Sequence, residues 1–351
     1  MEKIKFSDFE VIPVMDSIKN LNINDDEYFS SKFKKYVSNS KLKFIDPLEG
    51  GSPEVYTNPP VFTSQSLMIG SAVHEVLLQP EEFTLGPKLN RPTAKLGSAI
   101  DLIFRYRNKG MSIHKSIALA CKKADYYADS YETKIKNIFE KGLKYYMNLL
   151  HHENKTNKSE IFLSDKDFEI VSGCLNSCYN NKKLMDHLHP VNLFSIECES
   201  HNEDALFIDF IVTYKDKYFS RIPFKLKIDN WTIDPESQVI TLNDLKTTGK
   251  PVAWFMNLEY GSMQKFHYYR QMAVYGDILW WYCNNKFGAC KETGWTLKHN
   301  MLVVQTLDPY SSSCFPVSEN FIRKGRKEYK ELLKRIAYYS IFGFDKEVEF
   351  V

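Results

Sequence analysis

Residues 238–246 read Gln-Val-Ile-Thr-Leu-Asn-Asp-Leu-Lys, an apolar, β-prone run that ends in a carboxylate and an ammonium group. In a β-strand alternate side chains share a face, so two apolar side chains of this run lie on the same face as Asp244 and Lys246. The apolar members can enter a core, while Asp244 and Lys246 emerge together at the end of the strand. The stretch therefore predicts a half-buried strand that carries two charged groups.

A second carboxylate, Asp229, lies fifteen residues before Asp244. It closes the preceding β-rich run, so a hairpin could bring the two acids side by side. Carboxylates can ligate Mg²⁺, which prefers oxygen, and the ammonium of Lys246 can orient a metal-bound water and stabilise charge on a phosphate. With 44 acidic and 46 basic residues, chance alone supplies about six acid-x-base triplets, so an exposed salt bridge at a sheet edge is the alternative interpretation.

The composition is that of a globular protein with one large domain or two modest ones. Of the 351 residues, 43% are hydrophobic and 14% aromatic, and the formal charge of +2 neither demands nor excludes a nucleic-acid partner. The chain has no apolar run of about 18 residues and no signal peptide, so we expect a cytoplasmic protein without a membrane span. The seven cysteines include no Cys-x-x-Cys pair, which favours free thiols over disulfides or a zinc ribbon.

The order of helical and β-rich patterns predicts one α/β or α+β domain with a mixed sheet. Residues 64–79 show helical apolar spacing, with Ser64 as the N-cap and Pro80 as the stop, and the first 60 residues are turn-rich. The other expected elements are helices over about 95–185, β-rich runs at 193–198, 205–214, 218–228 and 238–245 with polar turns at 201–204, 215–217 and 234–237, a helix from about 253 or 264 to 283, a strand at 301–307 and a helix at 318–339.

Two further motifs flank the acidic pair. Gly70-Ser-Ala-Val-His74 lies on the first predicted helix, and Gln271 and Tyr275 share one face of the helix that follows the β-rich runs. Gly-x-x-x-His, an Asp that closes a strand, Asp-x-Lys and Gln-x-x-x-Tyr occur here in that order. This arrangement resembles the RecB-type branch of the PD-(D/E)XK nuclease superfamily.

Two stretches narrow the resemblance. Residues 68–83, Met-Ile-Gly-Ser-Ala-Val-His-Glu-Val-Leu-Leu-Gln-Pro-Glu-Glu-Phe, are similar to the G-(S/T)-A-x-H-x-x-L-L-x-P-x-x-F stretch of RecE-like exodeoxyribonucleases of the exonuclease VIII type. Residues 244–248 and 268–275 resemble their D-x-K-T-T and Y-(H/Y)-x-Q-x-x-x-Y motifs. The match spans about residues 38 to 280. It departs from the family pattern just before Asp229, where residues 225–228 read Lys-Leu-Lys-Ile without a glycine.

The resemblance implies a PD-(D/E)XK, restriction-endonuclease-like core. Residues 1–63 would pack on that core, and residues 64–351 would form the nuclease domain with a helical insertion at about 92–190. Asp229 and Asp244 would hold one or two Mg²⁺ or Mn²⁺ ions, with the backbone carbonyl of Leu245 as a further ligand. Lys246 would position or activate the attacking water.

Four more residues receive roles from the resemblance. His74 would lie at the metal or the phosphate. Gln271 would support the catalytic strand or contact DNA, and Tyr275 would pack beside it. Glu197, on the strand that opens the β-rich region, matches an acidic metal-site position of the family loosely, and Glu199 competes for the same position.

The resemblance also implies an activity. The protein would degrade one strand of linear double-stranded DNA exonucleolytically, most simply 5′ to 3′, in recombination or phage DNA processing. Its partners would be duplex ends and a single-strand annealing protein, and such nucleases often assemble as homo-oligomeric rings. Two alternatives stay open: an endonuclease or single-strand-specific nuclease on the same core, and a non-catalytic DNA-binding or assembly protein that keeps the nuclease fold.

Overall fold

The computed structural model describes residues 6–60, 64–127, 130–189 and 198–343. These residues fall into two compact units. The first comprises the described residues within 1–62, 178–305 and 311–351, and the second comprises those within 63–177 and 306–310. The second unit covers much of the region in which the sequence predicts a helical insertion.

The first unit is built on a six-stranded mixed sheet with the order β1-β4-β5-β6-β7-β8. Neighbouring strands run antiparallel except β6 and β7, which are parallel and are joined through a helical crossover, as a parallel pair requires. The sheet therefore confirms the expected mixed α/β architecture. Its strands are β1 (Phe9–Leu21), β4 (Glu199–Tyr214), β5 (Lys217–Asp234), β6 (Val239–Thr248), β7 (Thr296–Gln305) and β8 (Ser312–Pro316).

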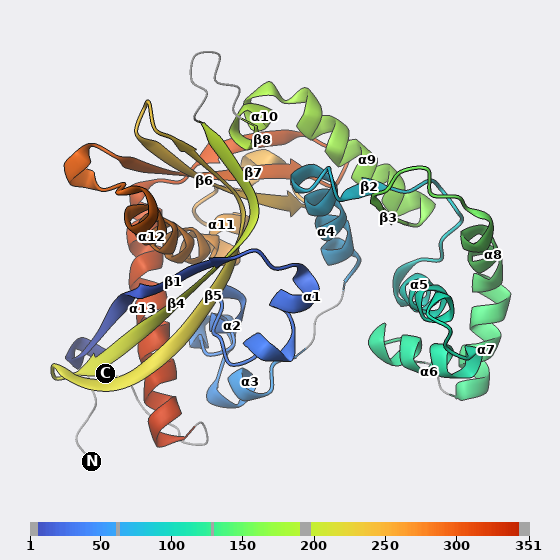
Figure 1. Ribbon diagram of the computed structural model, residues 1–351, viewed down its shortest axis with the longest axis horizontal. Helices are drawn as coiled ribbons and strands as arrows, with labels where there is room; N and C mark the ends of the chain where they lie inside the picture. Colours follow the sequence, from blue (N-terminus) through green and yellow to red (C-terminus); the bar gives the residue numbers. More distant parts are fainter. Residues whose placement is uncertain (1–5, 61–63, 128–129, 190–197, 344–351) are drawn as a thin grey trace. The chain divides into compact units, whose positions relative to one another are not determined.

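Two long helices, α12 (Tyr268–Phe287) and α13 (Glu319–Phe342), pack on each other and on the sheet (Figure 1). Helix α12 buries residues on nearly every side, from Tyr269 to Cys283, which explains its weak hydrophobic periodicity. The main hydrophobic core lies between these helices and the sheet. The shorter helices of this unit are α1 (Asp25–Tyr28), α2 (Asn39–Leu42), α3 (Pro53–Thr57), α10 (Lys182–Leu188) and α11 (Ser262–Lys265).

The second unit is mainly helical. Its first helix confirms the prediction for residues 64–79, since the Ser64 side chain caps it by accepting a hydrogen bond from the Leu67 amide. No helix in the described ranges is both long enough and apolar enough to cross a bilayer. The elements are α4 (Gln65–Leu78), α5 (Ala94–Asn108), α6 (Ile113–Lys123), α7 (Tyr131–Asn137), α8 (Leu143–His151), α9 (Asp165–Asn180, which continues into the first unit) and a parallel pair of short strands, β2 (Phe83–Leu85) and β3 (Ser159–Ile161).

The structure corrects three sequence expectations. The turn-rich N-terminal region contains strand β1, whose pairing with β4 shifts between Val14 and Lys19, so it shows no regular alternation. Strand β5 continues to Asp234, so Asp229 lies inside the strand and not at its end. The polar run at 201–204 belongs to β4 and is not a turn. The run expected at 193–198 lies outside the described residues except for Cys198.

Four asparagines form a hydrogen-bonded row across four neighbouring strands. In register, Asn202 of β4 faces Asn230 of β5, Asn230 faces Asn243 of β6, and Asn243 faces Asn300 of β7. Each Nδ2 donates to the Oδ1 of the preceding asparagine, over 2.7, 2.7 and 3.0 Å from β5 to β7. The last three side chains are buried. Because a buried amide without a partner is costly, this asparagine row favours one strand register over its neighbours.

We predict that Asn243→Leu lowers the free energy of unfolding by about 2–4 kcal/mol, because it removes the Asn243 partner of the buried Asn230 Oδ1 and leaves Asn300 Nδ2 only its 3.4 Å contact with His187. Urea denaturation followed by circular dichroism measures the loss. Asn320→Leu, at the exposed start of α13, is the matched control and should change stability little. Equal losses in the two variants would contradict a structural role for the row.

Candidate active site

The register of β5 and β6 brings the two predicted aspartates together. Asn230 pairs with Asn243, so Asp229 and Asp244 occupy the next facing positions. Oδ2 of Asp229 accepts a hydrogen bond of 2.8 Å from the backbone amide of Leu245. A carboxylate from one strand is thus fixed directly to the backbone of the other.

Lys246 completes the group. Its Nζ lies 2.5 Å from Oδ2 of Asp244 and 3.8 Å from Oδ2 of Asp229, and it donates a hydrogen bond of 3.2 Å to the Leu245 carbonyl oxygen. Burial disfavours the ammonium ion, but the two neighbouring carboxylates outweigh burial and raise the pKa of Lys246. The lysine therefore stays charged and can neutralise an anionic ligand only by exchanging its present partners.

Asp244 is the most buried member of this group. Burial raises the pKa of its carboxyl group, Lys246 opposes that rise, and the negative charge of Asp229 adds to it. Among the described residues its Oδ2 makes no hydrogen bond, only the ion pair with Lys246. A buried carboxylate with surplus acceptor capacity is suited to a cation.

Helix α12 supplies two of the predicted residues. Nε2 of Gln271 donates a 2.6 Å hydrogen bond to Oδ1 of Asp244, so the amide fixes one oxygen of the carboxylate. Tyr275 lies one helical turn later and is buried. Burial raises the pKa of its phenol, and the nearby carboxylates add to that effect, so the group remains protonated at neutral pH.

Glu203 is a carboxylate at this site that the sequence prediction missed. It lies on β4, and one of its oxygens is within 4.8 Å of an oxygen of Asp229. Burial raises the pKa of Glu203 to about 7, and the charge of Asp229 adds to the shift, whereas Lys227, whose Nζ lies 2.5 Å from Glu203 Oε2, opposes it. The polar run at 201–204 predicts a turn, and no local pattern indicates that the strand continues through it.

Three further predicted residues have separate outcomes. His74 is half-buried on α4 in the second unit, so its role at the site stays a prediction. Glu197 lies outside the described residues. Glu199 is exposed at the start of β4, where its Oε2 lies 3.0 Å from Nε2 of His201.

The donor atoms of the site fit a hard divalent cation. Asp229, Asp244 and Glu203 offer carboxylate oxygens, which Mg²⁺ and Mn²⁺ prefer, and no cysteine lies among these residues. Burial raises the pKa values of Asp244 and Glu203, the charge of Asp229 adds to the rise, and Lys246 and Lys227 do not fully offset it. These carboxylates can therefore hold a metal ion, whose identity the residues do not specify.

A family model matches residues 209–339, and it describes a PDDEXK-like domain of unknown function, DUF3799. The matched region contains Asp229, Asp244, Lys246 and Gln271. This part of the chain is a PD-(D/E)XK-like domain. The superfamily predicted from the sequence motifs is thereby confirmed, whereas the RecE-like subgroup stays a prediction.

Two solved structures resemble the chain distantly. One, from Eubacterium rectale, is described as a "putative exonuclease" and has 12% sequence identity with this chain. The TM-score is 0.45, and the match covers 93% of this chain and 89% of the other. The other is a protein from Vibrio cholerae with 10% identity and a TM-score of 0.19, and the match covers 80% of this chain and 57% of that one. No curated protein matches the sequence.

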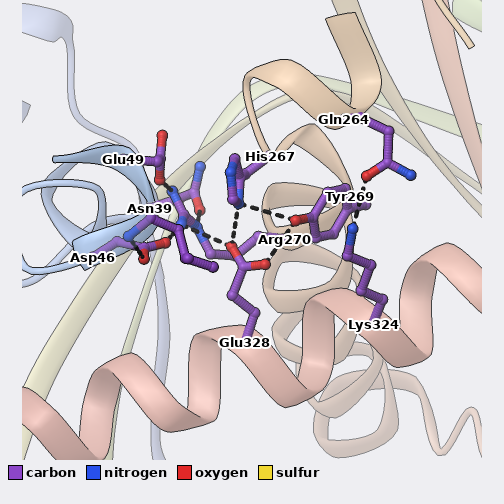
Figure 2. Close-up of polar contacts among 10 residues, drawn as sticks. Asn39, Asp46, Glu49, Gln264, His267, Tyr269, Arg270, Lys324 and Glu328 are labelled. Atoms are coloured by element: carbon purple, nitrogen blue, oxygen red, sulfur yellow. Dashed lines mark hydrogen bonds and ion pairs between the residues drawn. The ribbon is translucent and has the colours of Figure 1, made fainter. Parts of the chain in front are cut away.

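An ion-pair network anchors the start of α12 in the PD-(D/E)XK-like domain (Figure 2). Arg270, which is 2% exposed, contacts three carboxylates: Asp46 at 2.9 Å, Glu49 at 2.7 Å and Glu328 at 2.9 Å. Asp46 and Glu49 belong to the N-terminal segment, and Glu328 belongs to α13. The residue after Arg270 is Gln271, so the network fixes the helix end from which Gln271 reaches Asp244.

His267 extends this network. Its Nδ1 lies 2.6 Å from Oε1 of Glu328, and the Tyr269 hydroxyl donates to Oε2 of the same carboxylate at 2.7 Å. The hydrogen bond with Glu328 raises the pKa of His267, although partial burial opposes the shift. His267 has a positive φ of 51° just before α12, so its side-chain contacts hold an unfavourable backbone conformation.

We predict that His267→Gln destabilises the protein more at pH 5.5 than at pH 9. A group whose pKa is raised by folding contributes stability that is fully present below its unfolded pKa, about 6.5, and is lost as the pH rises through the folded value. Urea denaturation at the two pH values measures the difference. His114→Gln, on the exposed surface of α6, is the control and should lose little at either pH. A loss for His267→Gln that is larger at pH 9 would contradict this assignment.

Proposed function

We propose that the protein is a metal-dependent deoxyribonuclease that hydrolyses phosphodiester bonds. One observation carries the proposal: Lys246 lies within ion-pair distance of two aspartates, and the three residues come from adjacent strands of a PD-(D/E)XK-like domain. An exposed salt bridge at a sheet edge, the alternative interpretation, does not account for the burial of Asp244 or for the hydrogen bond that Gln271 makes to it.

Asp229 and Asp244 would hold the metal, with Glu203 and the Leu245 carbonyl as additional oxygen donors. A bound Mg²⁺ or Mn²⁺ supplies Lewis-acid polarisation of the phosphate and a more acidic water. Lys246 orients the attacking water and offsets the negative charge that develops on the phosphate. Gln271 keeps the Asp244 carboxylate in a fixed orientation by holding its Oδ1.

The finer assignment rests on the sequence motifs. From the RecE-like resemblance we propose an exonuclease on linear double-stranded DNA that proceeds 5′ to 3′ in recombination or phage DNA processing. His74 would contribute at the metal or the phosphate. A single-strand annealing protein and a ring of identical subunits would be its partners.

We predict that Asp244→Asn and Lys246→Met each lower the cleavage rate of linear DNA with Mg²⁺ by about 10²-fold or more, since each removes a charge that acts on the reacting phosphate. Asn keeps an acceptor for Gln271, so the first variant tests charge with little change in shape. Lys217→Met, on the exposed start of β5, is the control and should cleave normally. A wild-type protein that is inactive with both Mg²⁺ and Mn²⁺, or variants that cleave at the wild-type rate, would favour the non-catalytic alternative.

We predict further that linear duplex DNA is degraded to short products while covalently closed circular DNA stays intact, because an exonuclease needs an end. Labels at the 5′ or 3′ terminus report the polarity, and early release of the 5′ label is expected. Cleavage of the closed circle would establish the endonuclease alternative instead. A preference for a single strand over a duplex at equal length would establish the single-strand-specific one.

A further inference from the structure

The segment between β6 and α12, residues 252–266, carries an unusual set of exposed apolar side chains. Trp254 is 48% exposed, Leu258 71%, Tyr260 50% and Phe266 50%. Large aromatic side chains are normally buried or in an interface, so several on one short segment indicate a binding surface. The segment begins six residues after Lys246.

A series of ring contacts joins this segment to the candidate active site. Nζ of Lys246 lies 5.4 Å from the centre of the Tyr268 ring. The Tyr268 ring is in turn 5.6 Å from the exposed Phe266 ring and stacks at 5.8 Å on Phe255, which is buried. A ligand that reaches Lys246 therefore has aromatic surface within its reach.

A second pair of rings lies on the same segment. Trp254, the neighbour of the buried Phe255, contacts Tyr260 edge to face with ring centres 5.7 Å apart. Both rings are about half exposed. Such a pair leaves ring faces available to planar ligands.

The backbone holds these rings in place. The Asn257 side chain accepts hydrogen bonds from the amides of Glu259 and Tyr260, and its carbonyl oxygen accepts one from Gly261. A Cβ at Gly261 would lie 2.4 Å from the Asn257 carbonyl oxygen, so the close turn requires glycine. The exposed rings are thus presented by an ordered turn, and binding loses little conformational entropy there.

Positive charge accompanies the rings. Nζ of Lys265 lies 5.5 Å from the Phe266 ring centre, and Nζ of Lys324 lies 4.2 Å from that of Tyr269 and 2.7 Å from Gln264. Lys250, two residues before the segment, is exposed. Lys265 lies beside an exposed ring, and Lys324 contacts Gln264 of the same segment, which matches a ligand with both planar groups and phosphates.

We propose that residues 252–266 bind unpaired bases of a single DNA strand beside the site of cleavage. This inference rests on the proposed nuclease function, because that function places a DNA strand at Lys246. Aromatic stacking accepts any base, and the lysines contact the backbone, so the surface binds without sequence preference. A second copy of the chain fits this surface less well, since self-association would bring the same lysines towards one another.

The test measures binding of a fluorescent 20-nucleotide single strand to the full-length protein in EDTA, where metal-dependent cleavage cannot occur. We expect Trp254→Ala and Phe266→Ala each to weaken binding by about tenfold, the effect of one lost stacking contact. Tyr218→Ala is the matched control: Tyr218 is 68% exposed on β5, and its removal should leave the affinity unchanged. Because the substituted side chains are exposed, we expect the variants to fold, and thermal melts check this.

A second measurement uses Trp254 as a reporter. Base stacking should quench its fluorescence, and Trp254→Phe should lose the quenching while keeping affinity within about threefold of the wild type. Wild-type affinity in both alanine variants would overturn the inference. So would an equal loss in Tyr218→Ala, or a change of oligomeric state with unchanged binding, which would make the surface an interface between copies. A protein that binds the strand through these rings but never cleaves DNA would overturn the proposed function alone.

Discussion

The register between β5 and β6 is the constraint on which the candidate site depends. Side chains alternate along a strand, so a slip of one residue would turn Asp229 or Asp244 to the opposite face of the sheet. Apolar side chains alone tolerate such slips more readily than a row of buried amides does. The asparagine row lies next to the two aspartates. It makes other registers less favourable, and it thereby fixes the two facing positions that carry the carboxylates.

The first unit contains two clusters of acidic residues, one around Arg270 and one around Lys246. Their pKa shifts differ, and the difference distinguishes a structural cluster from a candidate functional one. Around Arg270, each carboxylate has a cation or hydrogen-bond donor beside it. Hydrogen bonds with His267 and Tyr269 lower the pKa of Glu328 although burial opposes the shift. Around Lys246, burial and mutual repulsion raise the pKa values of Asp244 and Glu203. A matched cluster stabilises the fold without further ligands. An unmatched one costs stability unless a cation binds, which is a property expected of functional sites.

Local sequence patterns predicted what depends on local physics. Hydrophobic periodicity and capping residues within a few positions predicted three elements: helix α4, the strand that carries Asp244 and Lys246, and the helix that carries Gln271. The remaining features depend on distant partners. Strand β1 is irregular and is stabilised by pairing with β4, nearly 200 residues later, and Glu203 becomes a site residue only because β4 continues through a polar run. No local pattern marks Arg270 as part of a network, because its three carboxylates come from two distant segments, the N-terminal segment and α13.

The burial of the candidate site bears on the form of DNA that can reach it. Asp244 is almost inaccessible, so a phosphodiester must approach closely, which a flexible single strand does more easily than a stacked duplex. Taking a terminal base out of its stack costs a few kcal/mol, and stacking it on an exposed aromatic ring returns about 1–3 kcal/mol. Rings connected to Lys246 through Tyr268 would therefore lower the free-energy cost of opening a duplex end where its backbone meets the carboxylates. The aromatic segment and the acidic site would then act on the same strand, with its bases bound by the first and its phosphates by the second.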